Sequence, residues 1–505
     1  MITRPRGARA AAPLALLLLA ATGCDGGADA PAKPSAPPAA SVARVCAGPA
    51  AGPAQAPAGA VTVDPAVVND LAAKTRTSPP HTTFWLRPGT HRLEADRYAQ
   101  VIPKEGNSYI GAPGAVLDGA KTNQYAFGGG ARDVTLRSLT VQGFVAPQNE
   151  GVVNHDSADG WVIEHATIQN NSGAGLMAGA RQRVSASCLR GNGQYGLNAY
   201  KGGGALGGLV IEGNEIVANN ADDWERRQPG CGCTGGVKFW AVNGADVRGN
   251  WVHDNRGPGL WADTNNNDFR IENNLLEGND GAALIYETSY NAVIRRNTIR
   301  RNNWVEGRGK ADEGDTFPYA TVYLSESGGE PRIPARTDKI EVDQNVLEDN
   351  WSGITLWENA DRFCNSPANT SSGDCTLLVK DHERCAQPMI AAAPLYADCR
   401  WKTQRVDIHG NRFVLDPSVV GCTAKCGRMA VLANYGTFPD WSPYKGEPVA
   451  EAITGKQENR WHDNVYLGPW SFVAHDPSRE LDAGQWQAAP YQQDAGSTFR
   501  PRAGG

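Results

Sequence analysis

The sequence predicts an all-β solenoid, in which short parallel strands coil into successive turns. Segments rich in β-branched residues and punctuated by asparagine recur through the chain, as in "IEGNEIVANN" (211–220), "IENNLLEGND" (271–280) and "IRRNTIRRNN" (294–303). The chain also contains 58 glycines in 505 residues, a share that favours tight turns over long helices. Both features predict many short strands joined by sharp bends.

The asparagines set the length of one coil. The second asparagine of each segment recurs at intervals of 36, 24, 23 and 48 residues, at Asn219, Asn255, Asn279, Asn302 and Asn350. A basic step of about 23 residues, lengthened by insertions, suits one turn of parallel strands. Leucine-rich repeats would need a leucine ladder, and propeller blades would need about 40 residues each. We expect the asparagines to adopt left-handed conformations at the bends and to hydrogen-bond between coils.

Residues 1–23 are predicted to be a signal peptide. Arg4, Arg6 and Arg9 precede the apolar run 14–21, which is too short to span a bilayer. "LAATGC", ending at Cys24, resembles a bacterial lipoprotein cleavage box with Ala21 in place of the usual leucine. This resemblance implies export and a lipid anchor at Cys24. An ordinary signal peptide that leaves one free thiol is the alternative.

An extended spacer should follow, because residues 24–60 are dominated by Ala, Pro and Gly. The chain has eleven cysteines, so lipid on Cys24 would leave ten, an even number suited to disulfides in an oxidising compartment. Short bridges are expected near Cys364, Cys375, Cys385, Cys399, Cys422 and Cys426.

The solenoid is predicted to occupy residues 61–415. Residues 64–75, with Asp64 as the N-cap, should form a helix that caps its open end. Residues 82–93 and 107–119 should form the first strands. Residues 416–505 are predicted to be an irregular C-terminal extension that packs back on the solenoid.

Residues 107–415, with the recurring asparagine segments, resemble the right-handed parallel β-helix superfamily, the pectate-lyase-like fold of many secreted carbohydrate-active proteins. The resemblance implies the fold. It does not select a reaction, because this fold hosts lyases, hydrolases, esterases, epimerases and non-enzymatic adhesins.

A second strand set aligns beside the asparagine segments: "GLNAYKG" (196–202), "GVKFWAV" (236–242), "GLWADTN" (259–265), "ALIYETS" (283–289), "TVYLSES" (321–327) and "GITLWEN" (353–359). Their alternation has a period of two, so one set of side chains faces inward and is almost entirely apolar. The other set faces outward and carries Tyr200, Lys238, Trp240, Trp261, Asp263, Ile285, Glu287, Tyr323 and Trp357. An outward face so rich in aromatic rings should be covered by loops or bind a ligand.

Asp263 and Glu287 fall at the same register on adjacent coils, so their carboxyl groups should lie roughly 5 Å apart. A carboxylate pair at about that spacing can serve as the acid and nucleophile of a retaining glycosidase. Lys238, on the preceding coil, should keep one acid charged, and we include it in the predicted catalytic set. A solvated acid pair or a metal site is the alternative interpretation.

The predicted substrate-binding residues surround this pair. Aromatic rings suit the apolar faces of sugars, and polar neighbours fix their orientation. The set comprises Trp240, Trp261, Tyr323, Tyr200, Trp357, Asn265 and His155. Packing of loops or of the Trp-rich C-terminal region on these rings is the competing explanation. The polar insertions 220–235 and 303–320 are expected to wall a groove.

The stretch "GLWADTNNND" (259–268) also resembles a calcium loop, because oxygen ligands alternate at Asp263, Asn265 and Asn267. It lacks the glycine and terminal glutamate of an EF-hand. We therefore expect residues 265–267 to form a turn and a side-chain ladder, and no cofactor, with calcium held by Asp263, Glu287 and an Asn carbonyl as the alternative.

A net charge of −6 without a basic stripe argues against a nucleic-acid partner. The leading hypothesis is an extracellular, monomeric glycoside hydrolase whose partner is a polysaccharide. A polysaccharide lyase or epimerase, with Lys238 or an arginine as base, is the second hypothesis. A non-enzymatic carbohydrate-binding surface protein is the third.

Overall fold

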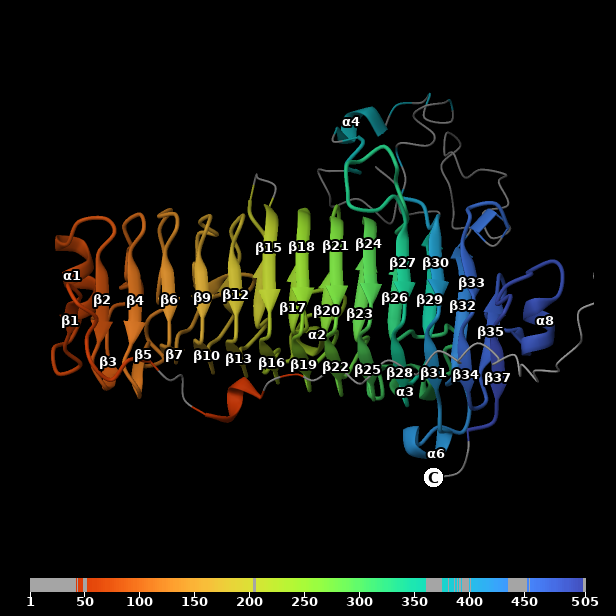
Figure 1. Ribbon diagram of the computed structural model, residues 1–505, viewed down its shortest axis with the longest axis horizontal. Helices are drawn as coiled ribbons and strands as arrows, with labels where there is room; N and C mark the ends of the chain where they lie inside the picture. The colour runs from red at the N-terminus through yellow and green to blue at the C-terminus, as the bar shows by residue number, and fades with distance from the viewer. Residues whose placement is uncertain are drawn as a thin grey trace, which may run out of the picture. The chain divides into compact units, whose positions relative to one another are not determined.

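The computed structural model describes residues 42, 44–48, 52–202, 206–359, 375–379, 381–385, 387, 389, 392, 399, 401–434, 452–453 and 455–502. The predicted solenoid is confirmed: parallel strands stack coil upon coil into three long sheets (Figure 1). From β6 to β35 each coil contributes one strand to each sheet in turn, as in β15, β16 and β17. We call these sheets 1, 2 and 3.

Sheet 1 contains β1 Val61–Val63, β2 Thr83–Leu86, β4 Ser108–Gly111, β6 Thr135–Arg137, β9 Val162–Glu164, β12 Arg183–Ser185, β15 Leu206–Glu212, β18 Val242–Arg248, β21 Asn267–Glu272, β24 Tyr290–Arg295, β27 Ile340–Asp343, β30 Val406–His409 and β33 Arg460–His462. Sheet 2 contains β3 Gly89–His91, β5 Ala115–Asp118, β7 Thr140–Gln142, β10 Thr167–Gln169, β13 Cys188–Arg190, β16 Glu215–Val217, β19 Trp251–His253, β22 Leu275–Glu277, β25 Thr298–Arg300, β28 Val346–Glu348, β31 Arg412–Val414, β34 Val465–Leu467 and β37 Thr498–Arg500.

Sheet 3 contains β8 Gly151–Val153, β11 Ala174–Met177, β14 Leu197–Ala199, β17 Val237–Phe239, β20 Leu260–Ala262, β23 Leu284–Glu287, β26 Val322–Ser325, β29 Ile354–Asn359, β32 Arg428–Asn434, β35 Ser471–Ala474 and the antiparallel β36 Glu480–Leu481. The short helices are η1 Val45–Ala47, α1 Asp70–Thr77, α2 Trp224–Arg227, α3 Glu306–Asp312, α4 His382–Cys385, α6 Pro417–Val420 and α8 Ala483–Gln487. None of the described helices is long and apolar enough to cross a membrane.

Two ladders of buried asparagines hold the bends together, as the repeat predicted. The expected left-handed conformation instead belongs to the residue before each asparagine, such as Ala218 with a φ of 53° and Asp254 with a φ of 52°. Asn219, in the bend after β16, donates from Nδ2 to Asn255 Oδ1 at 3.0 Å, and Asn255 donates in turn to Asn279 at 2.9 Å. A parallel ladder links Asn214, Asn250 and the equivalent residues at the bend between sheets 1 and 2. Each amide also satisfies backbone groups of adjacent coils, so the interior bends contain few unpaired polar groups.

The N-terminal cap begins later than predicted. α1 starts at Asp70, and Asn69 precedes it with a φ of 63° and no side-chain cap. Asp64 accepts a hydrogen bond from the Ala66 amide and stabilises a turn, so its assignment as the N-cap is wrong. The helix still packs on β1 and buries Leu71 and Thr75.

The solenoid also continues past residue 415, which corrects the predicted domain boundary. β33, β34, β35 and β37 extend all three sheets. The tryptophans expected to fold back over the solenoid instead fill its last coils: Trp461 and Trp486 are at most 2% exposed, and their rings lie 5.5 Å apart.

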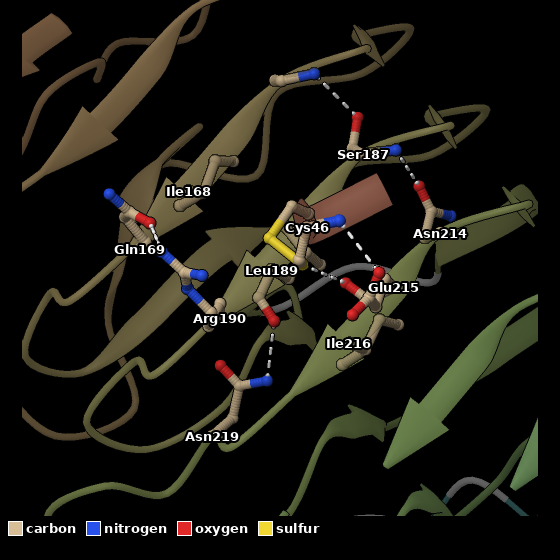
Figure 2. The surroundings of a disulfide bond; sticks show 12 residues. Cys46, Ile168, Gln169, Ser187, Leu189, Arg190, Asn214, Glu215, Ile216 and Asn219 are labelled. Carbon is tan, nitrogen blue, oxygen red and sulfur yellow. Dashed lines mark hydrogen bonds between the residues drawn. A yellow bond between two sulfur atoms is a disulfide. The ribbon is translucent and has the colours of Figure 1, made fainter. Parts of the chain in front are cut away.

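Part of the predicted spacer is attached to the solenoid. Cys46, in η1, forms a disulfide with Cys188 of β13, and its amide donates to Glu215 Oε2 at 2.9 Å (Figure 2). The bridge spans 142 residues of sequence. Residues 1–36, with the predicted signal peptide and Cys24, lie outside the described residues.

The other cysteines follow the disulfide expectation in part. Cys422 and Cys426 are bonded, as are Cys231 and Cys233, and Cys375 is also in a disulfide. Cys385 and Cys399 are buried thiols that contact each other. Cys364 lies outside the described residues.

Candidate active site

The predicted alignment of sheet 3 is confirmed by its register. Leu260 of β20 pairs with Val237 of β17 and with Leu284 of β23, and the same register continues into β26 and β29. The predicted inward side chains are at most 1% exposed: Leu197, Ala199, Val237, Phe239, Leu260, Ala262, Leu284, Tyr286, Val322, Leu324, Ile354 and Leu356. The alternate positions therefore project outward from the core.

Asp263 and Glu287 lie side by side. Ala262 pairs with Tyr286, which places the next residue of each strand opposite the other. The Asp263 amide donates to Phe239 O at 2.9 Å, so the parallel pairing extends through residue 263. Neighbouring strands are about 4.8 Å apart. Both side chains are well covered, at 7% exposure, but both line an open groove.

Lys238 and Trp261 tie the two acids together. Lys238 Nζ lies 2.9 Å from Asp263 Oδ2 and 3.8 Å from the centre of the Trp261 ring. Trp261 Nε1 donates to Glu287 Oε2 at 2.9 Å. The ammonium thus lies over the indole that orients Glu287, and it also forms the ion pair with Asp263. A paired charge inside a groove holds its partner in one geometry.

The groove above these residues has a volume of about 890 Å³. The insertion that carries α2 and the Cys231–Cys233 disulfide forms part of its wall, and α3 forms another part. Trp401, from the excursion between β29 and β30, also lines it. The expectation that the insertions 220–235 and 303–320 wall a groove is confirmed. Lys238 donates to the Gly232 carbonyl, which fastens the disulfide loop over the floor.

Glu306 is a groove residue that the strand alignment missed. It lies at the start of α3, and its amide donates to Asp280 O at 3.1 Å. Its side chain is accessible to solvent from the groove, but protein surrounds it on most sides. That loss of hydration, together with the charges of Asp280 and Glu225, raises the pKa of Glu306 to about 7. The polar insertion 303–320 predicted a wall of the groove. No local sequence pattern, however, distinguished Glu306 from the other charged residues of that insertion.

Two of the predicted substrate-binding aromatic residues, Tyr323 and Trp357, pack against Phe317 and not in the groove. Phe317, from the α3 insertion, packs edge-on against Trp357 at 5.1 Å and against Tyr323 at 6.2 Å. Neither Tyr323 nor Trp357 lines the groove. The competing explanation, loop packing on outward rings, therefore accounts for these two residues, whereas Trp240 and Trp261 do line the groove.

The structure does not bring the other three predicted binding residues into the groove lining. Tyr200 is 45% exposed after β14. His155 follows β8 and stacks on Tyr125 with ring centres 3.7 Å apart. Asn265 is 5% exposed and takes a left-handed turn with a φ of 58°. Their assignment to substrate binding remains a prediction that the groove geometry does not support.

Residues 265–267 form the expected turn and ladder. Asn266 donates to Ser289 Oγ at 3.1 Å, and Asn267 lies between Asn243 and Asn291 in a chain of amide hydrogen bonds. Among the described residues, no group of three or more His, Cys, Asp and Glu side chains is arranged to hold a metal ion. The asparagines of "GLWADTNNND" thus form the hydrogen-bonded bend, whereas Trp261 and Asp263 line the groove.

Comparison with known proteins identifies the fold. The family model described as "Right handed beta helix region" matches residues 150–362. This match and the parallel strands of the described residues show that the chain has a right-handed parallel β-helix fold. A search of curated proteins finds no match.

Solved structures that resemble the chain share little of its sequence. The A-module of mannuronan C-5 epimerase AlgE6 from Azotobacter vinelandii is 11% identical over 68% of this chain and 89% of that one, with a TM-score of 0.39. The catalytic unit of a GH87 α-1,3-glucanase from Streptomyces thermodiastaticus is 12% identical over 90% and 69%, with a TM-score of 0.37. PfbA, a surface adhesin of Streptococcus pneumoniae, is 8% identical over 57% and 82%, with a TM-score of 0.25.

Proposed function

We propose that this protein is a glycoside hydrolase that cleaves a polysaccharide outside the cell, with Asp263 and Glu287 as its catalytic carboxylates. The observation that carries the proposal is the placement of these two acids on adjacent coils, at the floor of a groove and beside the half-buried indole of Trp261. Two carboxyl groups about 5–5.5 Å apart suit a retaining mechanism.

The two acids have different surroundings, which suggest different roles. Asp263, paired with Lys238, is the nucleophile: its carboxylate attacks the anomeric carbon while protonated Glu287 donates its proton to the departing glycosidic oxygen. A glycosyl ester forms on Asp263. Glu287, now a carboxylate, takes a proton from water, whose oxygen attacks the anomeric carbon and releases Asp263. Trp261 holds Glu287 through its N–H, and Trp240 offers a further ring for a sugar face.

The lyase or epimerase hypothesis needs a neutral amine to remove the C5 proton of a uronate. Lys238 is in an ion pair with Asp263 and donates to a carbonyl, so its nitrogen is already engaged with two partners. The groove is also lined by more carboxylates than ammonium groups, which opposes an anionic polymer. These features weigh against the second hypothesis.

A polysaccharide screen tests the proposal. The purified protein is incubated with neutral, acidic and amino-bearing polysaccharides, and the release of reducing ends and of unsaturated products is measured. We expect reducing ends, with the first product retaining the anomeric configuration by NMR. Unsaturated products would favour the lyase, and binding without any cleavage would favour the non-enzymatic hypothesis.

We also propose that the protein is exported and anchored by lipid at Cys24. The signal-like residues 1–23 and the disulfides at Cys46–Cys188 and Cys422–Cys426 support this placement, because such bonds persist in oxidising compartments. Replacing Cys24 with serine should move the protein from the membrane fraction to the soluble fraction. Unchanged membrane association would contradict the anchor.

A further inference from the structure

The groove carries an excess of negative charge. Its lining includes five carboxylates and two ammonium groups. Both ammonium groups are already paired with carboxylates of the lining: Lys238 with Asp263 at 2.9 Å, and Lys310 with Glu313 at 2.9 Å. Neither Glu225 nor Glu306 forms an ion pair with another described residue. The groove therefore attracts cations and repels anions.

Glu306 is placed where a ligand on the groove floor would meet it. Its carboxylate lies directly over Gly281 and close to Gly257, at the point where the chain enters β23 and β20. A methyl group at position 281 would collide with the carboxylate, so the acid reaches this position only because residue 281 has no side chain. Burial, followed by the charges of Asp280 and Glu225, raises the pKa of Glu306, and Lys310 offsets only part of this effect.

Trp401 supplies an independent sign of a ligand. It is 1% exposed, it lines the groove, and its indole N–H has no hydrogen-bond acceptor among the described residues. Buried indole N–H groups usually find an acceptor, because an unpaired donor costs about 1–3 kcal/mol. The N–H itself is covered, so a hydroxyl or ring oxygen of a bound sugar would satisfy this donor once the groove lining shifts to admit it.

We propose that the groove binds a polysaccharide whose sugars carry primary amines, such as a deacetylated hexosamine polymer, with an ammonium group at Glu306 and a sugar oxygen at Trp401. The inference rests on the proposed function, since it names the substrate class of the same groove. An ammonium beside Glu306 and Glu225 supplies the cation that these acids lack. A polyuronate would bring further negative charge to the same place.

Calorimetry with three hexasaccharides tests the charge preference on the full-length protein. The probes are hexamers of glucosamine, of N-acetylglucosamine and of galacturonate, at low salt and at 4 °C to limit cleavage. The pH is 7, at which Glu306, with its pKa of about 7, is ionised in about half of the molecules. We expect the glucosamine hexamer to bind at least about tenfold more tightly than either of the others, and to weaken as salt rises. Equal or tighter binding of the acetylated or the uronate hexamer would overturn the proposal.

Two variants separate the charge from the hydrogen bond. Glu306→Gln should weaken binding of the glucosamine hexamer by about fivefold to tenfold and leave the acetylated hexamer unchanged. Trp401→Phe should weaken both hexamers by a similar factor, because it removes the N–H donor together with the five-membered part of the indole ring. Glu164→Gln, a matched change on sheet 1 outside the groove, should alter neither. An unchanged glucosamine affinity in Glu306→Gln would refute the assignment of Glu306.

The outcome also distinguishes this inference from the hydrolase proposal. Cleavage of a neutral polysaccharide, lost in Asp263→Asn and without any preference for amines, would retain the hydrolase and refute the inference. Selective binding of the glucosamine hexamer without cleavage of any polysaccharide would retain the inference and refute the hydrolase.

Discussion

The outer faces of sheets 1 and 3 are built from the same repeat but balance charge differently. On sheet 1, acids meet arginines of neighbouring coils: Arg137 pairs with Glu164, Arg270 with Asp246 at 3.0 Å, and Arg295 with Glu272 at 2.7 Å. In the sheet 3 groove, carboxylates outnumber ammonium groups. A solvated face gains from local neutrality, so the unbalanced face is the one at which we propose that a ligand binds.

The largest expected effect is a loss of enzymatic activity when a carboxyl group is removed from the sheet 3 face but not when one is removed from the sheet 1 face. Glu287→Gln should lower the rate of reducing-end release by about 10³-fold, because the departing sugar oxygen loses its proton donor. Initial rates on the polysaccharide identified by the screen, together with the melting temperature, provide the measurement.

Glu164→Gln is the matched control for this change. It removes a sheet 1 carboxylate that pairs with Arg137, so activity should stay within about twofold of the wild type. Comparable losses in both variants would mean that the two faces do not differ in function.

The next effect concerns the stability of sheet 2. Replacing both Cys46 and Cys188 with serine should lower the free energy of unfolding by about 2–5 kcal/mol, because the bridge closes a long loop. Denaturant unfolding measures the loss. Activity at 25 °C should persist, since the bridge lies on sheet 2 and outside the groove. A large loss of activity in the folded double-serine variant would mean that the disulfide on sheet 2 affects the groove on sheet 3.

A smaller effect is expected at the interior bend before sheet 3. Asn255→Ala should cost about 2–3 kcal/mol, because the Asn219 backbone N–H and side-chain amide both lose their acceptor inside the core. Chemical denaturation measures this cost. Asn198→Ala, on the outward side of β14, should cost less. Asn198 is also buried, but its side chain donates a single hydrogen bond, to Asn149 O at 3.3 Å. Equal costs would mean that the ladder contributes no more than one such bond.

The smallest effect is the pH dependence of Glu306. Its pKa is raised from 4.5 to about 7 in the folded protein, so the native state holds a proton that the unfolded state has lost between these values. Stability contributed by this group therefore falls as pH rises from about 4.5 to 7 and is level above that range. Glu306→Gln should raise the melting temperature at pH 8 and have little effect at pH 4. An offset that is the same at every pH would contradict the raised pKa.

Much of the site followed from periodicity alone. The alternation of β20 and β23 placed Leu260 and Leu284 inside and Asp263 and Glu287 outside, because a strand alternates faces with a period of two. The same periodicity could not show that Phe317 covers Trp357, because that contact depends on how an insertion folds.

The sequence by itself determined the coil, the asparagine ladders and the column of outward residues, because these depend on a repeat that each strand carries locally. Only the tertiary structure decided that the solenoid continues past residue 415, that Cys46 bonds to Cys188, and that Glu306 and Trp401 face the same groove. These features join segments far apart in the chain. Their positions depend on how the insertions pack against the finished sheets, which no local pattern specifies.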